Sequence, residues 1–200
     1  MGTGVVKLPG LNCGRTGLTE VQAKEAGYDV VTVLAVTDDK AHYYPDAAFF
    51  ATKLIADRKT HKLLGMQVFG PGAVDKMVDI AVMAINMGAV LEDFENADFA
   101  YAPPFSTAIH PFVQAVYILL NKINGDLVSM TPAEYAAGAA DGYRVIDVAP
   151  APSIRGSHLC GFGLGQRRDP GNWPGREAFA GVRPGQTGLF SPEPDEILRL

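Results

Sequence analysis

The stretch FFATKLIADRKTHKLLGMQVF, residues 49–69, decides the fold class. Its two apolar halves, 49–56 and 63–69, flank the polar segment 57–62, which is the pattern of two antiparallel strands joined by a turn. Hairpins next to one another build an antiparallel sheet, which can leave one face for helices. The segment therefore favours an α+β fold, with helices packed on a mostly antiparallel sheet, over a doubly wound parallel sheet.

The residues before the hairpin predict two more strands and a short helix. Residues 5–8 and 28–36 are rich in β-branched and aromatic side chains and predict strands. Thr19 is followed three positions later by Gln22, the pattern of a capping box. A helix over about 20–26 should follow.

Two longer helices are predicted after the hairpin. Apolar residues recur every three or four positions over 73–87, and Gly88 should end this helix. A second apolar stripe, 112–123, predicts a helix that is entered through His110-Pro111, because proline suits the first helical position. We interpret these stripes as more apolar surface than a domain of this size leaves in water, and expect self-association through the sheet and the last helix.

Charge and composition exclude several classes of protein. The chain has 200 residues and a net charge of -5, without a basic patch, so nucleic acid is not an expected partner. No apolar stretch reaches the roughly 18 residues of a membrane span, which predicts a soluble, cytoplasmic protein with no membrane partner. Cys13 and Cys160 are far apart in the sequence and predict neither a disulfide framework nor a zinc site. No metal is expected.

The composition changes near residue 149. Residues 149–200 contain 9 Gly, 7 Pro and six Arg, a composition typical of irregular segments. An out-of-frame reading of a GC-rich gene end and an ordinary flexible tail both explain this change. In either case we expect a largely irregular tail without a packed core.

Several short words of the sequence, in their order and spacing, carry a family resemblance. They are Val5-Val6-Lys7, Gly17-Leu18-Thr19-Glu20, Ala26-Gly27-Tyr28, Tyr43-Tyr44-Pro45, Lys53-Leu54, Leu64-Gly65-Met66-Gln67, Val78-Asp79 and Tyr101-Ala102-Pro103-Pro104-Phe105-Ser106. Together they resemble the C-terminal dimerisation domain of FAD-dependent pyridine nucleotide-disulfide oxidoreductases. The last word is most similar to the coenzyme A-disulfide reductase and NADH oxidase branch. The resemblance implies the reductase dimerisation-domain fold for residues 1–126.

A second resemblance follows the first along the chain. Met130-Thr-Pro-Ala-Glu-Tyr135 and Tyr143-Arg-Val-Ile-Asp-Val148 resemble the opening of a rhodanese domain, which predicts a truncated rhodanese-like start over 127–148. Rhodanese sulfur transfer needs a Cys-x-x-Gly-x-Arg loop, and Gly165 stands where the arginine after Cys160 should be. We therefore do not expect Cys160 to carry a persulfide.

The family implies FAD and NAD(P)H, and each is held by a GxGxxG turn between a strand and a helix. No such fingerprint occurs in the sequence, since Gly161-Phe-Gly-Leu-Gly165 follows no predicted strand. We expect a fragment without the FAD and NAD domains, so that the 200-residue chain alone binds no cofactor and is inactive.

Two tyrosines are the main candidates for chemistry. In coenzyme A-disulfide reductases, two tyrosines of this domain reach the thiol-disulfide centre of the partner subunit, where a phenolic O–H can donate to a thiolate. The resemblance assigns this role to Tyr101 and to Tyr43, with Tyr44 as the alternative to Tyr43. The competing interpretation is that Tyr43 and Tyr44 belong to a turn and Tyr101 to an interface.

His110 has two possible roles. In the glutathione-reductase branch a His-Pro pair at this place supplies an acid/base, with a glutamate five positions later, where this chain has Ala115. A capping or interface role is therefore favoured over catalysis. His42 and His61 are expected to be solvated loop residues, and Cys13 a small buried side chain on the first strand of the domain.

The sequence thus leaves three hypotheses. The first is a homodimerisation module that completes the active site of a partner subunit, with coenzyme A disulfide or a related thiol as substrate. The alternatives are a separately encoded subunit that joins an FAD/NAD-binding chain, and a degenerate rhodanese-type sulfurtransferase.

Overall fold

The computed structural model describes residues 2–141, 144–146, 188–190 and 197–199. It divides into two units, Met1–Asp126 and Leu127–Leu200. Each unit is described by itself.

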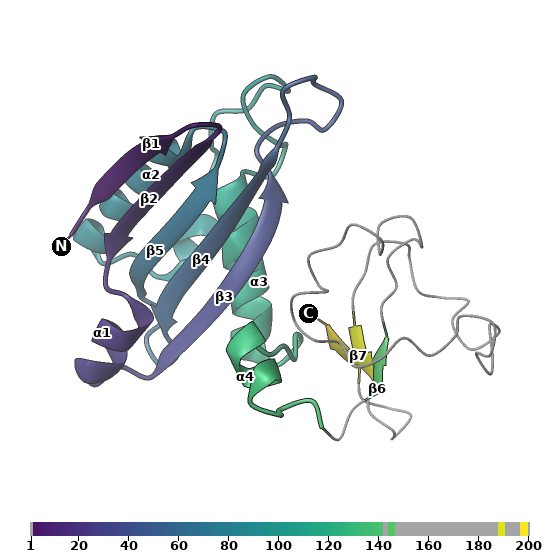
Figure 1. Ribbon diagram of the computed structural model, residues 1–200. Coiled ribbons are helices and arrows are strands. Elements are labelled where there is room, and N and C mark those ends of the chain that lie inside the picture. Colours follow the sequence, from purple (N-terminus) through teal and green to yellow (C-terminus); the bar gives the residue numbers. More distant parts are fainter. Residues whose placement is uncertain (1, 142–143, 147–187, 191–196, 200) are drawn as a thin grey trace, which may run out of the picture. The chain divides into compact units, whose positions relative to one another are not determined.

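Unit 1 is built on a five-stranded antiparallel sheet with the strand order β1-β2-β5-β4-β3 (Figure 1). The strands are β1 (Gly4–Leu8), β2 (Leu11–Gly17), β3 (Val30–Asp38), β4 (Phe49–Asp57) and β5 (Leu63–Gly70). The hairpin predicted over 49–69 is β4–β5, in which Ala51 lies opposite Phe69. The predicted α+β fold with an antiparallel sheet is confirmed. The bounds of strand β2 were not predicted, because its sequence LNCGRTG alternates apolar and polar residues only over its first three positions.

Three α-helices belong to unit 1, and their ends agree with the predicted caps. They are α1 (Glu20–Glu25), α2 (Val74–Met87) and α3 (Pro111–Asn124), with a short 3-10 helix η1 (Leu91–Phe94) after α2. Gly88 and Gly125 follow α2 and α3 with φ angles of 65° and 86°, a conformation that glycine adopts without steric cost. Both long helices lie on the same face of the sheet (Figure 1).

The apolar stripes of α2 and α3 form the core of unit 1. Phe112 and Leu119 of α3 are fully buried, and Met77 and Val78 of α2 are 1% exposed. The expectation that these stripes form a surface for self-association is therefore wrong. The sheet of the same unit covers both stripes. The exposed apolar residues lie outside them.

The packing of α2 against the sheet depends on a small residue in β2. A Cβ added to Gly14 would lie 2.6 Å from Cγ2 of Val78, a distance that no real contact allows. Gly14 therefore faces α2, and its neighbours in β2 face the other side of the sheet, because successive side chains alternate.

The opposite face of the sheet carries a row of apolar or small side chains in register across all five strands. Val6, Phe69 and Val36 in this row are 52%, 49% and 64% exposed. The complete row is Val6, Cys13, Phe69, Ala51 and Val36. We call it the open face.

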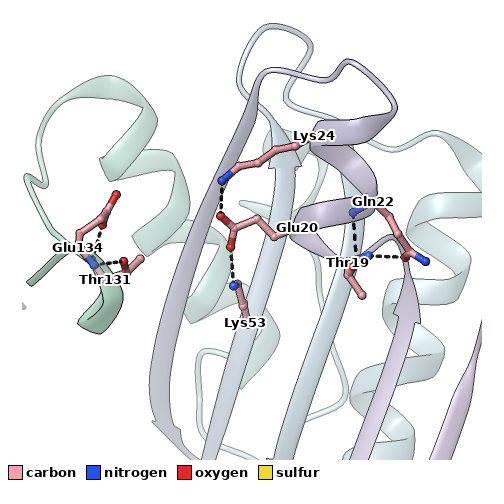
Figure 2. A network of polar contacts seen from close by, with 7 residues as sticks. All are labelled: Thr19, Glu20, Gln22, Lys24, Lys53, Thr131 and Glu134. Atoms are coloured by element: carbon pink, nitrogen blue, oxygen red, sulfur yellow. Dashed lines mark hydrogen bonds and ion pairs between the residues drawn. The ribbon is translucent and has the colours of Figure 1, made fainter. Parts of the chain in front are cut away.

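The helix α1 lies at one end of the sheet (Figure 1). The predicted capping box is confirmed: Thr19 Oγ1 accepts from the Gln22 N–H, and Gln22 Oε1 accepts from the Thr19 N–H. Glu20 accepts hydrogen bonds from Lys24 at 2.7 Å and from Lys53 of β4 at 2.6 Å (Figure 2). These two ammonium groups lower the pKa of Glu20 and tie α1 to the sheet.

Unit 2 begins with the helix α4 (Pro132–Ala136), which has its own capping box between Thr131 and Glu134 (Figure 2). Three short strands form an antiparallel sheet: β6 (Arg144–Ile146), β7 (Gly188–Phe190) and β8 (Ile197–Arg199). The strands β7 and β8 are three-residue elements within the segment that was expected to be largely irregular. Cys160, Gly161–Gly165 and most of the predicted tail lie outside the described residues.

No helix among the described residues combines the length and the apolar character that a bilayer crossing needs. In the same part of the chain, no three His, Cys, Asp or Glu side chains gather into a possible metal site.

Candidate functional site

Two connecting segments of unit 1 meet beyond the ends of β3 and β4 (Figure 1). The first, 39–48, joins these two strands and holds Tyr43 and Tyr44, whereas the second, 95–110, leads into α3 and holds Tyr101 and His110. The Ala41 N–H donates to the Pro103 carbonyl at 3.3 Å, so the segments are bonded to each other. The candidate residues thus come together at one end of the sheet.

The segment 39–48 is closed by Asp39, which is 6% exposed. The Asp39 N–H donates to the Ala48 carbonyl at 2.8 Å, and the Ala48 N–H donates to Asp39 Oδ1 at 2.8 Å. Between these bonds, Tyr43 is 67% exposed, and its ring lies 5.2 Å from that of Tyr44. Both tyrosines belong to turns, and the Tyr43 ring is free to meet another surface.

Tyr101 is held by the turn that follows it. The Phe105 and Ser106 N–H groups donate to the Ala102 carbonyl at 2.8 and 3.2 Å, which fixes the Pro103-Pro104 corner. The Tyr101 side chain is 53% exposed and lines a cavity of about 380 Å³ together with His110. Among the described residues no group accepts from its hydroxyl, so the phenol is available as a donor. Tyr43 and Tyr44 do not line this cavity.

His110 caps α3 with its side chain, in agreement with the predicted capping role. Its Nδ1 accepts from the Phe112 N–H at 3.2 Å, and the residue is 6% exposed. Burial, with a smaller contribution from the positive charge of Lys76, lowers the pKa of His110 to about 4. A ring that stays neutral at physiological pH and whose Nδ1 is occupied is a poor general base.

Two other sequence expectations need correction. Cys13 lies on β2, the second strand, and is half-buried on the open face, where its neighbours in register are Val6 and Phe69. Cys13 is therefore neither fully buried nor on the first strand. The first strand is β1, which forms the edge of the sheet. His61 is not simply solvated, since its Nδ1 is hydrogen-bonded to Glu92 Oε1. His42 is exposed, as expected, and its ring lies against that of Tyr43.

The connection from β5 to α2 joins a strand to a long helix through glycines, as a dinucleotide site requires. It reads Gly70-Pro71-Gly72, and Pro71 has no N–H to offer a phosphate. A Cβ on Gly72 would lie 2.7 Å from Asp39 Oδ2, so a carboxylate already lies against this side of the turn. Because a carboxylate repels phosphate, this turn does not fit the pyrophosphate of the FAD or NAD(P)H that the family resemblance implies.

A second hollow lies on the outer side of α2. It measures about 840 Å³ and is lined by apolar residues that include Met83, Met87 and Phe94, with Asp75 and Asp79 among its acidic residues. Met83 and Met87 are 56% and 77% exposed. We call this hollow the α2 groove. Phe99 lines both the α2 groove and the cavity beside Tyr101, so the two hollows share one wall residue.

Sequence reasoning missed three residues around His110. Phe99 packs its ring 4.8 Å from the His110 ring, Tyr117 lines the same cavity, and Lys76 contributes its charge from α2. Tyr117 lies seven positions after His110, which is about two helical turns. Helical periodicity could therefore have placed it on the same side of the helix as His110. Phe99 and Lys76 meet His110 only through the tertiary fold.

Residues 5–112 match the pyridine nucleotide-disulphide oxidoreductase dimerisation domain. The chain belongs to this family. The match begins in β1 and ends at the first turn of α3, so it includes the sheet, α2 and both tyrosine segments.

Two relatives of this dimerisation domain have names that refer to sulfur and disulfide chemistry. The CoA-dependent NAD(P)H sulfur oxidoreductase of Pyrococcus furiosus is 36% identical over 60% of this chain and 27% of its own length. The coenzyme A disulfide reductase of Staphylococcus epidermidis is 28% identical over 56% of this chain and 24% of its own length. The chain therefore spans about a quarter of the curated relatives it matches.

A solved structure gives the same result for the fold. The reduced CoADR-RHD of Bacillus anthracis is 28% identical, with a TM-score of 0.72, over 77% of this chain and 28% of that one. The fold of unit 1 is thus the reductase dimerisation-domain fold, and the chain is related to coenzyme A-disulfide and sulfur reductases.

Proposed function

We propose that this chain is a homodimerisation module that completes the active site of a partner subunit in an FAD- and NAD(P)H-dependent thiol-disulfide oxidoreductase. Its substrate class is coenzyme A disulfide or a related thiol compound. The observation that carries this proposal is the exposed Tyr101 phenol at a cavity that shares the wall residue Phe99 with an apolar groove. The names of the relatives support the substrate class.

The α2 groove is our candidate for the surface that meets the second copy. Its exposed methionines give the helix a second apolar face, and a helix that is apolar on both sides is normally covered on both. The groove shares Phe99 with the Tyr101 cavity, so a partner seated on it would contact a residue that also lines that cavity. The open face lies on the other side of the sheet, and we assign it to the FAD/NAD-binding portion of the enzyme.

The chemical role proposed for Tyr101 is donation of a hydrogen bond to the thiolate that forms when a disulfide is reduced. A hydrogen bond to a charged acceptor in a site that excludes water contributes about 1 to 3 kcal/mol. Tyr43, or its neighbour Tyr44, is the second donor, because its segment is bonded to the Tyr101 segment through Ala41 and Pro103.

The experiment is Tyr101→Phe in the enzyme that joins this domain to its flavin and nicotinamide portions. Turnover with coenzyme A disulfide should fall by roughly 5- to 150-fold, the range that corresponds to 1 to 3 kcal/mol, while flavin content and dimer content stay unchanged. Tyr28→Phe is the matched control, since Tyr28 is 44% exposed and follows α1, outside both segments. Wild-type turnover by Tyr101→Phe in an intact dimer would remove the proposed role.

The remaining domain assignments stay proposals. We propose that 127–148 is the start of a rhodanese-like domain, and that 149–200 forms no domain of its own. The CoADR-RHD structure covers 77% of the chain, a larger share than unit 1 alone, which supports the first of these assignments. The 200-residue chain by itself is expected to be colourless after purification, and a flavin absorption band retained through gel filtration would contradict this.

A further inference from the structure

His110 is an unusual helix cap. Serine, threonine, aspartate and asparagine are the usual N-cap residues, because a short side chain brings its oxygen to the first free N–H groups. Here an imidazole does so with Nδ1, at 3.2 Å from the Phe112 nitrogen, and the ring is buried as well. A bulky ring in this place suggests a task beyond capping.

The cap determines where the proton of the ring lies. Because Nδ1 accepts a hydrogen bond, it carries a lone pair, and the proton of the neutral imidazole is on Nε2. Among the described residues the structure shows no acceptor for this Nε2–H. The ring lines the cavity that Tyr101 also lines. Two residues with a donor that no described residue accepts from, Tyr101 and His110, therefore line the same cavity.

Several charged and titratable groups surround the ring. Lys76 approaches from α2, Glu95 and Asp98 line the cavity from the segment before Tyr101, and Tyr117 lines it from α3. The Tyr117 hydroxyl donates to the Glu95 carbonyl. Neither acid forms an ion pair with His110 among the described residues, whereas the helix N-terminus and Lys76 both disfavour a positive ring.

The ring also restrains the segment that carries Tyr101. The Phe99 ring packs on His110 with 4.8 Å between centroids and 37° between planes. On the other side of Tyr101, the Pro103 carbonyl is bonded to Ala41. The backbone around Tyr101 is therefore held at two points: by the ring contact of Phe99, two residues before it, and by the hydrogen bond of Pro103, two residues after it.

We propose that His110 is the positioning residue for Tyr101, holding the Tyr101 segment through Phe99 and placing a neutral Nε2–H beside the acceptor that Tyr101 binds. The identity of that acceptor as a thiolate rests on the proposed function. The placement itself concerns the described residues of this chain, and it is tested without turnover.

The first measurement is the tautomer of His110 in the full chain, from two-bond proton–nitrogen correlation spectra of protein labelled with ¹⁵N-histidine. His110→Asn identifies the signals. The expected pattern is a neutral Nε2–H ring from pH 5.5 to 8. An Nδ1–H pattern, or protonation with a midpoint near the ordinary histidine value of about 6.5, would overturn the proposal.

The second measurement is the ¹⁹F signal of Tyr101 in the full chain labelled with 3-fluorotyrosine, assigned through Tyr101→Phe. His110→Asn keeps a cap acceptor for Phe112 and removes the ring, so the Tyr101 signal should move more than that of any other tyrosine. His42→Asn is the control, because the His42 ring contacts Tyr43 at 5.7 Å, and it should move the Tyr43 signal instead.

An unchanged Tyr101 signal in folded His110→Asn would overturn the proposal. If that variant fails to fold, the wild-type signal decides. It should change over the same pH range as the His110 ring nitrogens of the first measurement, near pH 4, and show no inflection near pH 6.5. A Tyr101 signal that ignores the protonation of His110 would contradict the proposed positioning. These results are independent of whether Tyr101→Phe lowers turnover.

Discussion

The two faces of the unit 1 sheet carry apolar residues for different reasons. On the covered face, Val31, Leu54 and Met66 are at most 2% exposed beneath α2 and α3. On the open face, Val36 is 64% exposed and Phe69 is 49% exposed. Sequence periodicity identifies both sets as apolar without separating a domain's own core from its contact surfaces. The separation depends on which face the helices occupy.

Removing a large side chain from the core between α3 and the covered face should have the largest effect on the free energy of unfolding. Phe112 is fully buried, and its ring packs edge-on against Phe94 at 5.2 Å. Phe112→Ala should lower the free energy of unfolding by about 3 to 5 kcal/mol, because it leaves a cavity in a close-packed core. Urea denaturation of the full chain measures this. A loss below about 1 kcal/mol would mean that α3 is not packed as described.

A substitution in the α2 groove should have the next largest effect. The groove lies on the side of the sheet that the helices cover, but outside the core. Met87 is 77% exposed, so Met87→Lys should leave the unfolding free energy nearly unchanged. If a second copy covers the groove, the dimer dissociation constant should rise by about 10- to 100-fold.

Sedimentation equilibrium at tens of micromolar measures this constant. An unchanged dimer in Met87→Lys would exclude the α2 groove as the self-association surface. A wild-type chain that stays monomeric would contradict self-association of the isolated chain altogether.

The buried His110 ring makes the free energy of unfolding depend on pH. Its pKa is about 4 in the folded chain and about 6.5 when unfolded. Between these values the unfolded state binds more protons, so the stability that His110 contributes is complete above pH 6.5 and falls as the pH drops toward 4. At pH 5 the loss should be about 1 to 2 kcal/mol, with some screening by solvent at the ring edge.

The difference between wild type and His110→Asn isolates this contribution from that of the carboxylates. Wild type should lose more stability than His110→Asn between pH 7 and pH 5 in urea denaturation. Parallel curves for the two proteins would contradict a buried neutral ring.

The open face should show the smallest effect in the isolated chain. Phe69→Thr replaces a half-exposed ring with another good strand former, and the unfolding free energy should change by no more than about 0.5 kcal/mol. The dimer dissociation constant should not change. A tenfold weaker dimer in Phe69→Thr would show that the second copy sits on the open face and not on the α2 groove.

The local elements of unit 1 were predictable because their signals are local. The capping box at Thr19 and Gln22 and the glycines after α2 and α3 act through neighbours within four residues. The hairpin over 49–69 was predictable for the same reason. The strand β2 was not, since its residues pair with β5 in spite of a poor strand composition, and only the partner strands make it form. The capping box at Thr131 and Glu134 was present in the sequence but was used there only as part of a resemblance.

The candidate site was predictable only in part. Tyr43, Tyr44, Tyr101 and His110 follow from sequence words, whereas the contacts that join them do not. The stacking of Phe99 on His110 and the bond from Ala41 to Pro103 connect residues 11 and 62 positions apart. Such contacts depend on how the chain closes and leave no periodic signal.

The most direct test of the central claim is a mixed dimer of the complete reductase. One subunit carries Tyr101→Phe with a working flavin portion, and the other carries wild-type Tyr101 with an inactivated flavin portion. If Tyr101 serves the partner's site, the mixed dimer contains one complete site of the two that twofold symmetry provides, and its turnover should be about half that of wild type. Turnover as low as that of the Tyr101→Phe homodimer would contradict the account, because Tyr101 would then serve its own subunit or no site at all.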